Sequence, residues 1–429
     1  MADERSAPDV EASSPTVEGR EFFTTMTVAE ALERFRPERR TTVEPVAAAA
    51  SAEALGRVPV DDVVAPSNLP GFARSTVDGY AVRAADTFGA SEGLPSYLDV
   101  VGAVTMGEVP DLEVPPGGAV TMPTGGALPR GADAVVMVEH TQVTMPGAVE
   151  VVRPVAAGDG VVRADEDVAS GAVLVPAGRP LRAQDLGVLA AAGVMSVEVR
   201  ARPRVVVLST GDEVVPPDTA MLVPGQVRDA TASALAGLIT SAGGVADLRG
   251  IVPDDAGALD AAMRAALADG VDLVVVSAGS SVGARDETAG VVAALGEPGI
   301  VVHGLAVKPG KPTLLAECDG VPVIGLPGNP LSALVVFRLV GVPLVWRLAG
   351  CERPPAVPTA RAALGRPVAS AAGRLDVVQV RVDENGVAHP LLGASALLSL
   401  LTRADGYVVI PEPETGLTQG TEVEVTLYR

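Results

Sequence analysis

From Arg204 onward the chain alternates apolar segments with helical ones, and this alternation constrains its fold more than any other feature. Segments such as RVVVLS (204–209) and VDLVVVS (271–277) are nearly continuous apolar runs, whereas 230–243 and 255–270 have helical spacing. Strands that are apolar on both faces and separated by helices indicate a parallel sheet covered on both sides. We therefore predict an α/β domain over residues 204–350 with a mostly parallel sheet.

Three loops directly follow apolar strands of this domain: STGDE (209–213), SAGSSVGARD (277–286) and LPGNP (326–330). Because ligands of open α/β sheets bind beyond the C-terminal ends of the strands, we expect these loops to converge on one pocket. The second loop can offer backbone N–H groups to a phosphate, or it is an ordinary strand-helix turn; it lacks the Gly-Lys-Ser/Thr ending of a nucleoside triphosphatase loop. The candidate substrate-binding residues are Ser209, Thr210, Gly211, Asp212, Ser277, Gly279, Ser281, Gly283, Pro327, Gly328, Asn329 and Pro330.

The sequence KPGKP (308–312) sets two lysines three residues apart on a Pro-Gly frame. Proline restricts the backbone and glycine allows a sharp bend, so we expect the two ammonium groups to be held near one point. In LPGNP, Asn329 is a good N-cap and Pro330 a good first residue for a helix running to about Trp346, and a helix N-terminus favours anions. The pattern predicts an anion site; the alternative is two surface lysines beside an ordinary turn.

Composition excludes several classes of function. The formal charge of −21, with 32 basic and 53 acidic residues, and an aromatic content of 3% argue against a nucleic-acid-binding surface. The two cysteines and three histidines show no zinc-ligand spacing. The N-terminus has no signal pattern, and we interpret the apolar run 331–346, interrupted by Arg338, as too short to span a bilayer. We expect a reduced cytoplasmic protein without a membrane partner.

The rest of the chain suggests further domains. Residues 1–22 have the composition of a disordered tail, Thr27 can cap a helix, and a second helix is expected over 46–55. Short Val-rich segments broken by Gly and Pro make 58–149 a mostly β region. After a further β-like stretch, AQDLGVLAAAGV is a helix candidate that ends at Gly193, and residues after 353 indicate a small β barrel or sandwich.

Taken together, KPGKP and LPGNP resemble the molybdopterin molybdenumtransferases, the MoeA and gephyrin E-domain family. Four upstream blocks resemble that family in the same order: PGFARSTVDGYAV (70–82), TGGALPRGADAVVMVE (124–139), EDVASG (166–171) and STGDE (209–213). The resemblance covers most of the chain from about residue 25 to the end. The ordered set is far more specific than any one Gly-rich block.

The resemblance implies a multidomain α/β protein. Its parts would be a discontinuous helical/β linker and dimerisation domain (23–57 and 150–203), an inserted β-rich domain (58–149), a molybdopterin-binding α/β domain (204–350) and a C-terminal β-barrel-like domain (351–429). It also implies a homodimer in which residues of the inserted region face the α/β domain of the other subunit. The site would then be shared between two chains.

The resemblance also assigns roles to charged residues. It implies catalytic roles for Asp78, Glu166, Asp286, Lys308 and Lys311, Mg²⁺ ligands at Asp229, Asp286 and Glu166, and substrate contacts from Thr124 and Arg374. Carboxylate oxygens are the ligands that Mg²⁺ prefers, and a planar guanidinium suits a tetrahedral oxyanion. From the residues alone, each carboxylate could instead be an N-cap or a solvated loop charge, and Arg374 an exposed ion-pairing arginine.

Four positions depart from the family pattern. The Gly-rich loop has Ala278 and Ala284 where the family usually has glycine, so a left-handed backbone at either position would require the loop to move. Thr231 stands where the family has asparagine, and Ala394 where it has serine. The charged residues of the family pattern are all present, but these four changes put the fine geometry of substrate binding in doubt.

These patterns favour a molybdenum insertase. The resemblance implies adenylylated molybdopterin and molybdate as substrates, Mg²⁺ as cofactor and AMP as product. Three alternatives remain: a divergent paralogue that uses tungstate, a molybdopterin adenylyltransferase, which would resemble residues 204–350 only, and a non-catalytic scaffold. The sequence does not separate molybdate from tungstate, since both are tetrahedral dianions of nearly the same size.

Overall fold

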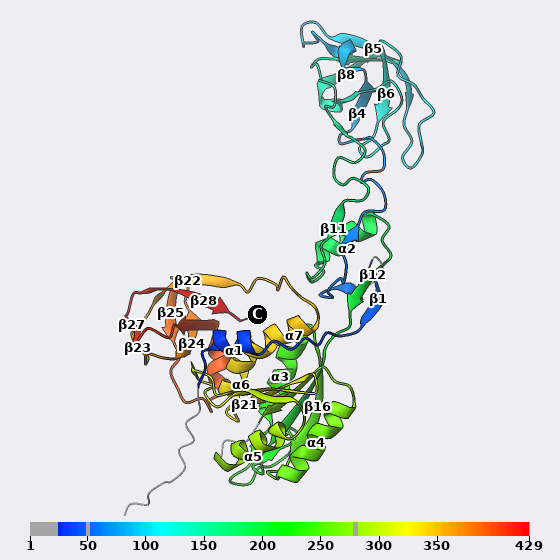
Figure 1. Cartoon of the computed structure of the whole chain (residues 1–429). Helices are drawn as coiled ribbons and strands as arrows, with labels where there is room; N and C mark the ends of the chain where they lie inside the picture. Colours follow the sequence, from blue (N-terminus) through cyan, green and yellow to red (C-terminus); the bar gives the residue numbers. More distant parts are fainter. Residues whose placement is uncertain (1–24, 49–51, 278–281, 429) are drawn as a thin grey trace, which may run out of the picture. The chain divides into compact units, whose positions relative to one another are not determined.

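The computed structural model describes residues 25–48, 52–277 and 282–428, with only the backbone described from Val282 to Asp286. Contacts divide the chain into two compact units (Figure 1). Unit 1 takes its described residues from Met1–Arg39, Pro203–Val345 and Ala356–Arg429; unit 2 takes them from Arg40–Arg202 and Trp346–Pro355. The predicted disordered tail, residues 1–22, lies outside the described residues.

A six-stranded sheet forms the centre of unit 1. Its order is β16 (Val245–Val252), β13 (Arg204–Thr210), β17 (Leu273–Ser277), β21 (Val321–Leu326), β20 (Leu314–Cys318) and β18 (Pro298–His303). The first four strands are parallel, whereas β20 and β18 are antiparallel to their neighbours. The loops after β13, β17 and β21 therefore leave the same edge of the sheet.

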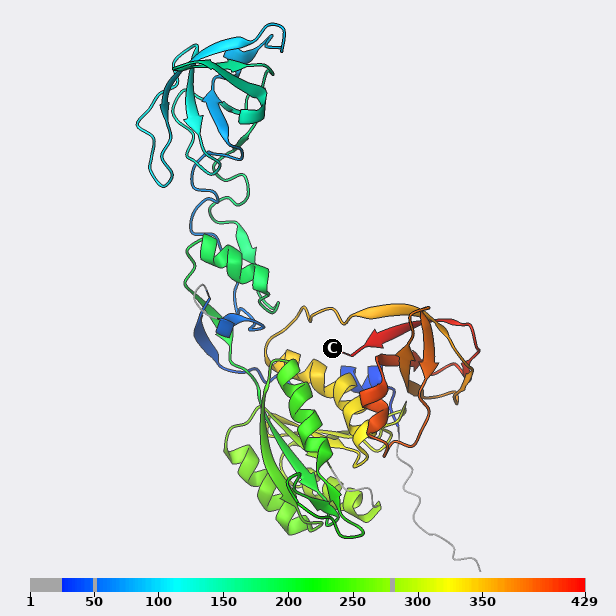
Figure 2. The same ribbon diagram turned by 180° about the vertical axis from the view of Figure 1, so that it is seen from behind.

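Helices cover both faces of this sheet (Figures 1 and 2). On one face, α4 (Ala256–Ala268) and α5 (Val282–Ala293) enclose a core in which Met263 and Val292 meet buried strand valines. On the other face lie α3 (Ala230–Ser241) and α6 (Pro330–Val336), which contact each other. Because both faces are covered, the strands are apolar throughout, which is the pattern read from the sequence.

Helix α6 continues through a π-helical turn, η4 (Phe337–Gly341), into α7 (Val342–Leu348). The whole helix has 19 residues and a mean hydropathy of 1.8, so by length and composition it could cross a bilayer. The prediction that this apolar run is too short was therefore wrong, because the helix begins at Pro330 and ends after Trp346. Two-thirds of it, 67%, is buried inside the protein, as expected for a core helix.

A closed five-stranded barrel forms the C-terminal part of unit 1. Its strands follow the order β24 (Leu375–Val382), β25 (Val387–Pro390), β22 (Thr359–Leu364), β28 (Glu422–Leu427) and β26 (Gly406–Ile410), and β26 pairs back onto β24. Alternate residues such as Val380, Val408 and Val425 fill its interior. Outside the closed ring, β19 (Val307–Lys308) pairs in parallel with β24, so the KPGKP segment is attached to the barrel.

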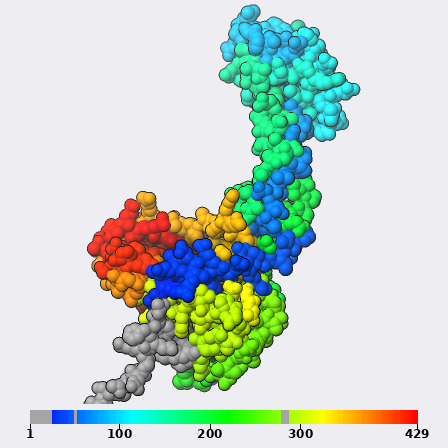
Figure 3. Space-filling model, in the orientation of Figure 1, coloured from blue at the N-terminus to red at the C-terminus, as the bar shows by residue number. Residues whose placement is uncertain are grey.

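The first helix, α1 (Val28–Arg34), begins at the predicted cap. Thr27 and Glu30 form a capping box, in which each side chain accepts from the other's backbone N–H. The preceding residue Met26 bridges to Leu305, and Figure 3 shows this N-terminal segment at the surface of unit 1 between the α/β part and the barrel. By its contacts α1 groups with unit 1, whereas the resemblance placed it in the linker domain.

Unit 2 contains a six-stranded β sheet over the region predicted to be mostly β. Its order is β7 (Ala134–Met137), β4 (Gly79–Val82), β6 (Gly118–Met122), β5 (Ser96–Ala103), β9 (Ala148–Val151) and β8 (Thr141–Met145). Gly79 in β4 lies against the neighbouring strand so closely that a Cβ would stand 1.8 Å from the Val136 carbonyl oxygen. Glycine is therefore required there.

In unit 2, strands that precede this sheet in the sequence pair with strands that follow it. β1 (Val43–Ala47) pairs with β12 (Ser196–Arg200), and β2 (Val63–Val64) with β11 (Val173–Val175). The helix predicted over 46–55 was wrong where the structure describes this segment: residues 43–47 are a strand, and Ala52–Ala54 form a 3₁₀ turn. Pro45 and the β-branched Val43 and Val46 favour the strand, and pairing with β12 stabilises it.

A buried carboxylate fixes the start of α2 (Ala183–Ala191) in unit 2. Asp185 accepts two hydrogen bonds from Arg179, at 2.7 and 2.9 Å, and further ones from Arg182. Burial raises the pKa of this carboxyl, but the hydrogen bonds from the two arginines outweigh burial and hold the pKa well below its ordinary value. The charged carboxylate therefore stabilises the fold above its ordinary pKa, and this contribution is lost as the pH falls through the lowered value.

We expect Asp185→Asn to destabilise unit 2 by about 3 kcal/mol at pH 7, because the variant leaves Arg179 without a buried counter-charge. The difference from wild type should shrink as the pH falls below about 4, because Asp185 of the unfolded chain then begins to protonate while the native carboxylate stays charged. Thermal unfolding at pH 7 and pH 3 measures both effects. As a control, Asp260→Asn removes the exposed Asp260–Arg264 pair of α4 and should cost at most about 0.5 kcal/mol. An equal loss at both pH values would contradict the assignment.

Candidate functional site

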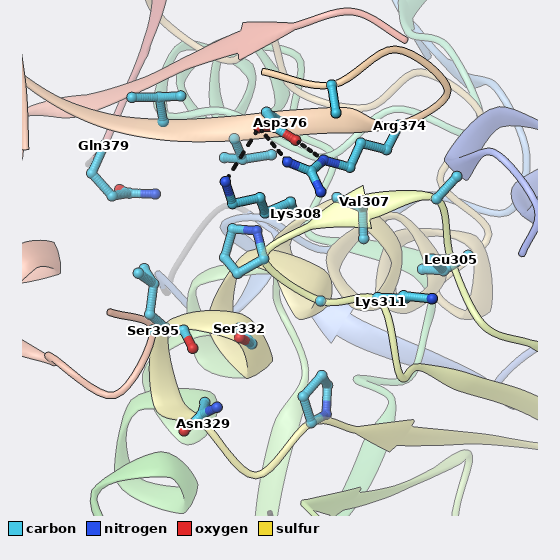
Figure 4. A pocket seen from close by; sticks show the side chains of 18 of the residues that line it. Leu305, Val307, Lys308, Lys311, Asn329, Ser332, Arg374, Asp376, Gln379 and Ser395 are labelled. Atoms are coloured by element: carbon cyan, nitrogen blue, oxygen red, sulfur yellow. Dashed lines mark hydrogen bonds and ion pairs between the residues drawn. The ribbon is translucent and has the colours of Figure 1, made fainter. Parts of the chain in front are cut away.

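A cavity of about 910 Å³ opens in unit 1 where the KPGKP turn, the start of α6 and strand β24 meet (Figure 4). Its polar lining comes from segments far apart in the sequence: Lys308, Lys311, Asn329, Ser332, Arg374, Asp376, Gln379 and Ser395. The α/β part supplies one wall and the barrel the other. No single sequence motif therefore defines this cavity.

Strand pairing brings the cations of the cavity to one carboxylate. Because β19 pairs with β24, Lys308 lies opposite Asp376, with 3.8 Å between the lysine Nζ and Oδ2. Arg374 donates from Nε to Asp376 Oδ1 at 2.8 Å and from Nη2 to Oδ2 at 3.4 Å. Asp376 is only 3% exposed. A buried carboxylate thus orients two cations that remain open to the cavity.

The two lysines of KPGKP do not converge as predicted. Figure 4 shows the Lys308 side chain directed toward Asp376 and the Lys311 side chain leaving the turn in another direction, although both residues line the cavity. The expectation of two ammonium groups near one point was therefore wrong, because their spacing of three residues spans a bend at Gly310. Arg374, from the barrel, takes the place beside Lys308 that was expected for Lys311.

Gly310 lets the turn pack against α6. Its φ is +127°, and a Cβ there would lie 2.4 Å from Cγ2 of the buried Val336. The Gly310 carbonyl also accepts a hydrogen bond from the Thr313 hydroxyl at 2.7 Å. Both the backbone conformation and the close approach exclude a side chain at this position.

We expect Gly310→Ala to destabilise unit 1 by about 3 kcal/mol, because backbone strain and a clash with Val336 add together. The matched control is Gly320→Ala, where φ is +84° and a Cβ would meet nothing within 4 Å. This control carries backbone strain alone and should cost about 1 kcal/mol. Thermal unfolding of both variants provides the comparison. Similar losses in the two proteins would show that contact with α6 is unimportant.

A second cavity, of about 430 Å³, lies beyond the ends of the parallel strands. Residues of all three predicted loops line it: Ser209, Thr210, Ser277, Gly328, Asn329 and Pro330. The expected convergence is confirmed for the first and third loops and for Ser277, while residues 278–281 of the second loop lie outside the described residues. Asn329 also lines the first cavity, so this residue belongs to the walls of both cavities.

Asn329 stands at the N-cap of α6 with Pro330 at the first helical position, as predicted. The Asn329 side chain makes no capping hydrogen bond.

Asp229, a predicted metal ligand, lines the second cavity and also caps α3. One carboxylate oxygen accepts from the Ala232 N–H at 3.0 Å, and the other accepts from the Ser209 hydroxyl at 2.6 Å. Glu213, which the sequence did not single out, lines the same cavity. Among the described residues, no group of three or more His, Cys, Asp or Glu side chains gathers that could hold a metal ion by itself.

Two predicted substrate contacts lie beside the second cavity and do not line it. Gly211 has φ of +136° and forms the tight turn after β13, and Asp212 accepts from the Asp254 N–H at 3.2 Å. Burial raises the pKa of Asp254, and the charges of Asp212 and Glu213 add to this effect. The Asp212 carboxylate thus contacts the β16–α4 connection, and its role as a substrate contact stays a prediction.

The Gly-rich loop is shorter than predicted. Ala278, Gly279, Ser280 and Ser281 lie outside the described residues. Helix α5 begins at Val282, so Gly283, Ala284 and Asp286 belong to the helix and not to a loop. Ala284 therefore lies in a helix, where the regular backbone has negative φ and accepts alanine.

The remaining predicted residues lie in unit 2, where three sequence blocks come together. The Asp78 carboxylate accepts from the Thr124 N–H at 2.8 Å. Ser75 exchanges backbone hydrogen bonds with Gly125 and Gly126, and Val168 pairs with Leu69. Glu166 accepts from the Arg163 N–H at 2.9 Å. Their roles in a site stay predictions.

Comparisons with known proteins cover nearly the whole described chain. Three family descriptions match in order: MoeA N-terminal region (domain I and II) over residues 26–193, a molybdopterin binding domain over 206–347, and MoeA C-terminal region (domain IV) over 361–428. Molybdopterin molybdenumtransferase 2 of Mycobacterium tuberculosis is 33% identical over 379 residues, which are 87% of this chain and 93% of that protein. Molybdopterin molybdenumtransferase of Bacillus subtilis is 30% identical, covering 88% of each. A crystal structure of the molybdopterin biosynthesis MoeA protein from Pyrococcus horikoshii has a TM-score of 0.81 at 30% identity and covers 94% of this chain and 100% of that one.

The chain belongs to the MoeA family. Its membership makes it a transferase with a role in molybdenum cofactor biosynthesis. Two departures from the MoeA pattern lie in the cavity walls: Ala394 lines the first cavity, and the buried Thr231 lines the second. Sequence reasoning missed Asp376 and Gln379 as cavity residues. The signal was two polar residues, Asp376 and Gln379, within the valine-rich strand β24.

Proposed function

We propose that the chain inserts molybdenum from molybdate into adenylylated molybdopterin, in the presence of Mg²⁺, with release of AMP. One observation supports this most: a cation-lined cavity and a hydroxyl- and carboxylate-lined cavity share Asn329. A tetrahedral dianion suits the first cavity, and a phosphate-bearing substrate suits the second. A substrate bound across Asn329 would place its reacting sulfurs beside the oxyanion, and such proximity lowers the barrier.

In the first cavity, Lys308 and Arg374 attract molybdate against the overall charge of −21. Asp376 holds both cations in place before the anion arrives, so little reorganisation is needed on binding. Lys311 adds positive charge at the rim. The Ser332 and Ser395 hydroxyls line the same space and can donate to oxyanion oxygens.

In the second cavity, the hydroxyls of Ser209, Thr210 and Ser277 face the phosphate-bearing part of the substrate. The donor set fits Mg²⁺, because this ion is usually held by one or two carboxylates together with substrate phosphates, and Asp229 and Glu213 line the space. Asp286 remains a third candidate from the sequence. Bound Mg²⁺ would neutralise phosphate charge while the phosphoanhydride bond breaks.

We also propose a cytoplasmic homodimer with a shared site. Asp78, Thr124 and Glu166 of unit 2 would complete the site of the partner subunit. The clustering of their three sequence blocks in unit 2 supports a common role. The acidic composition supports small anionic substrates over nucleic acid as partners.

The proposal is tested by incubating the purified full chain with adenylylated molybdopterin, Mg²⁺ and either molybdate or tungstate. We expect AMP and metallated cofactor to form together, and only when an oxyanion is present. Formation of adenylylated molybdopterin from molybdopterin and ATP would instead support the adenylyltransferase alternative. Absence of AMP and of metallated cofactor in every arm would contradict the proposal.

A further inference from the structure

Gln379 is a buried, uncharged polar side chain in the wall of the first cavity. It lies in β24, is 3% exposed and lines the cavity on the barrel side. Its side-chain Nε2 has no hydrogen-bond partner among the described residues. A buried amide donor without a partner is costly, and native proteins keep few of them without a function.

The other end of the same amide is occupied. The hydroxyl of Tyr428 donates to Gln379 Oε1. An amide has one accepting and one donating end, so this hydrogen bond turns Nε2 away from Tyr428. Figure 4 shows the Gln379 nitrogen directed into the cavity, toward the side where Lys308 lies.

Tyr428 is itself held by three contacts. Its backbone N–H donates to the Asp405 carbonyl at 2.8 Å, and its ring lies 5.8 Å from that of Tyr407. Arg338, in the π-helical turn η4, stands 4.5 Å from the centre of the Tyr428 ring. Burial raises the pKa of Tyr428 to about 12, so its hydroxyl stays protonated and donates at neutral pH.

We propose that Gln379 contacts the oxyanion through Nε2 and that Tyr428 is the positioning residue that orients this amide. The inference rests on the proposed function of the first cavity as an oxyanion site. A neutral donor complements the two cations there: it binds an oxygen of the anion without adding charge. The barrel thus contributes Asp376 and Gln379 from β24 and Arg374 from the residue directly before this strand.

The test is a calorimetric titration of the full-length protein with sodium molybdate. This measurement of binding needs no turnover. Gln379→Met keeps the shape but removes the donor, and should weaken binding about tenfold, the loss expected for one hydrogen bond to a charged group. Gln379→Glu keeps the acceptor for Tyr428 but places a negative charge in the cavity. It should weaken binding more than Gln379→Met does.

The positioning role has its own variants. Tyr428→Phe keeps the ring under Arg338 and should weaken molybdate binding about threefold or more, because the amide is no longer oriented. In Gln379→Met, the same tyrosine change should cause no further loss, since there is no donor left to orient. Tyr407→Phe is the matched control: it removes a neighbouring hydroxyl, leaves the Tyr428–Gln379 bond intact and should bind as wild type does.

Lys308→Ala distinguishes a failure of the inference about Gln379 from a failure of the oxyanion site itself. If Lys308→Ala weakens molybdate binding while both Gln379 variants bind normally, the inference about Gln379 is overturned and the oxyanion site stands. If none of the three variants changes affinity, the oxyanion site itself is wrong. Additive losses from Gln379→Met and Tyr428→Phe would overturn the positioning role alone.

Discussion

Lys308→Ala is expected to raise the molybdate concentration for half-maximal rate about tenfold, while the rate at saturating molybdate stays close to wild type. The variant removes one charge-assisted contact to the incoming anion, and the 59% exposure of the side chain places the effect at the lower end of the range for such contacts. Excess molybdate should therefore rescue the defect. Initial rates against molybdate at several Mg²⁺ concentrations provide the measurement.

Two further variants serve as controls for this assignment. Lys311→Ala should show a smaller increase, because its side chain is directed away from Asp376 (Figure 4). Asp286→Asn removes the carboxylate that the sequence proposes for Mg²⁺, so molybdate should not rescue it, whereas added Mg²⁺ should do so in part. Rescue of Asp286→Asn by molybdate, without rescue of Lys308→Ala, would reverse the roles.

Combining two variants that are each impaired at limiting molybdate should restore activity if the site is shared between subunits. Asp78→Ala alters unit 2 and Lys308→Ala alters unit 1, so a mixed dimer would have one intact site and one doubly altered site. The purified mixed dimer should therefore have about half of the wild-type number of intact sites. The two tagged variants are co-expressed, the mixed dimer is purified, and its rate at limiting molybdate is compared with that of each parent.

The control for this experiment carries both substitutions in one chain, co-expressed with wild type. Its mixed dimer pairs each altered unit with an intact one, and should have no intact site if the site is shared. Full activity of one subunit in that mixed dimer would show that each chain works alone. A monomer at micromolar concentration in sedimentation would contradict the homodimer directly.

Local sequence determined the elements of the α/β part. Thr27, Asp229 and Asn329 stand at helix N-caps, and apolar runs such as 204–209 became buried strands, because capping and hydrophobic burial depend on neighbouring residues. The loops after those strands could be placed in one cavity, since parallel strands end at a common edge. The helix expected over 46–55 failed because pairing of Pro45 and Val46 with β12, about 150 residues later, decides the conformation there.

Only the tertiary structure decided how the first cavity is built. The sequence marked Lys308, Lys311 and Arg374 as cationic, but it could not show that β19 pairs with β24 and thereby places Lys308 against Asp376. Nor could it show Gln379 as a cavity donor, because that depends on closure of the barrel and on the position of Tyr428. Charge and turn chemistry are local properties of the chain, whereas the direction of a side chain is set by contacts between residues far apart in the sequence.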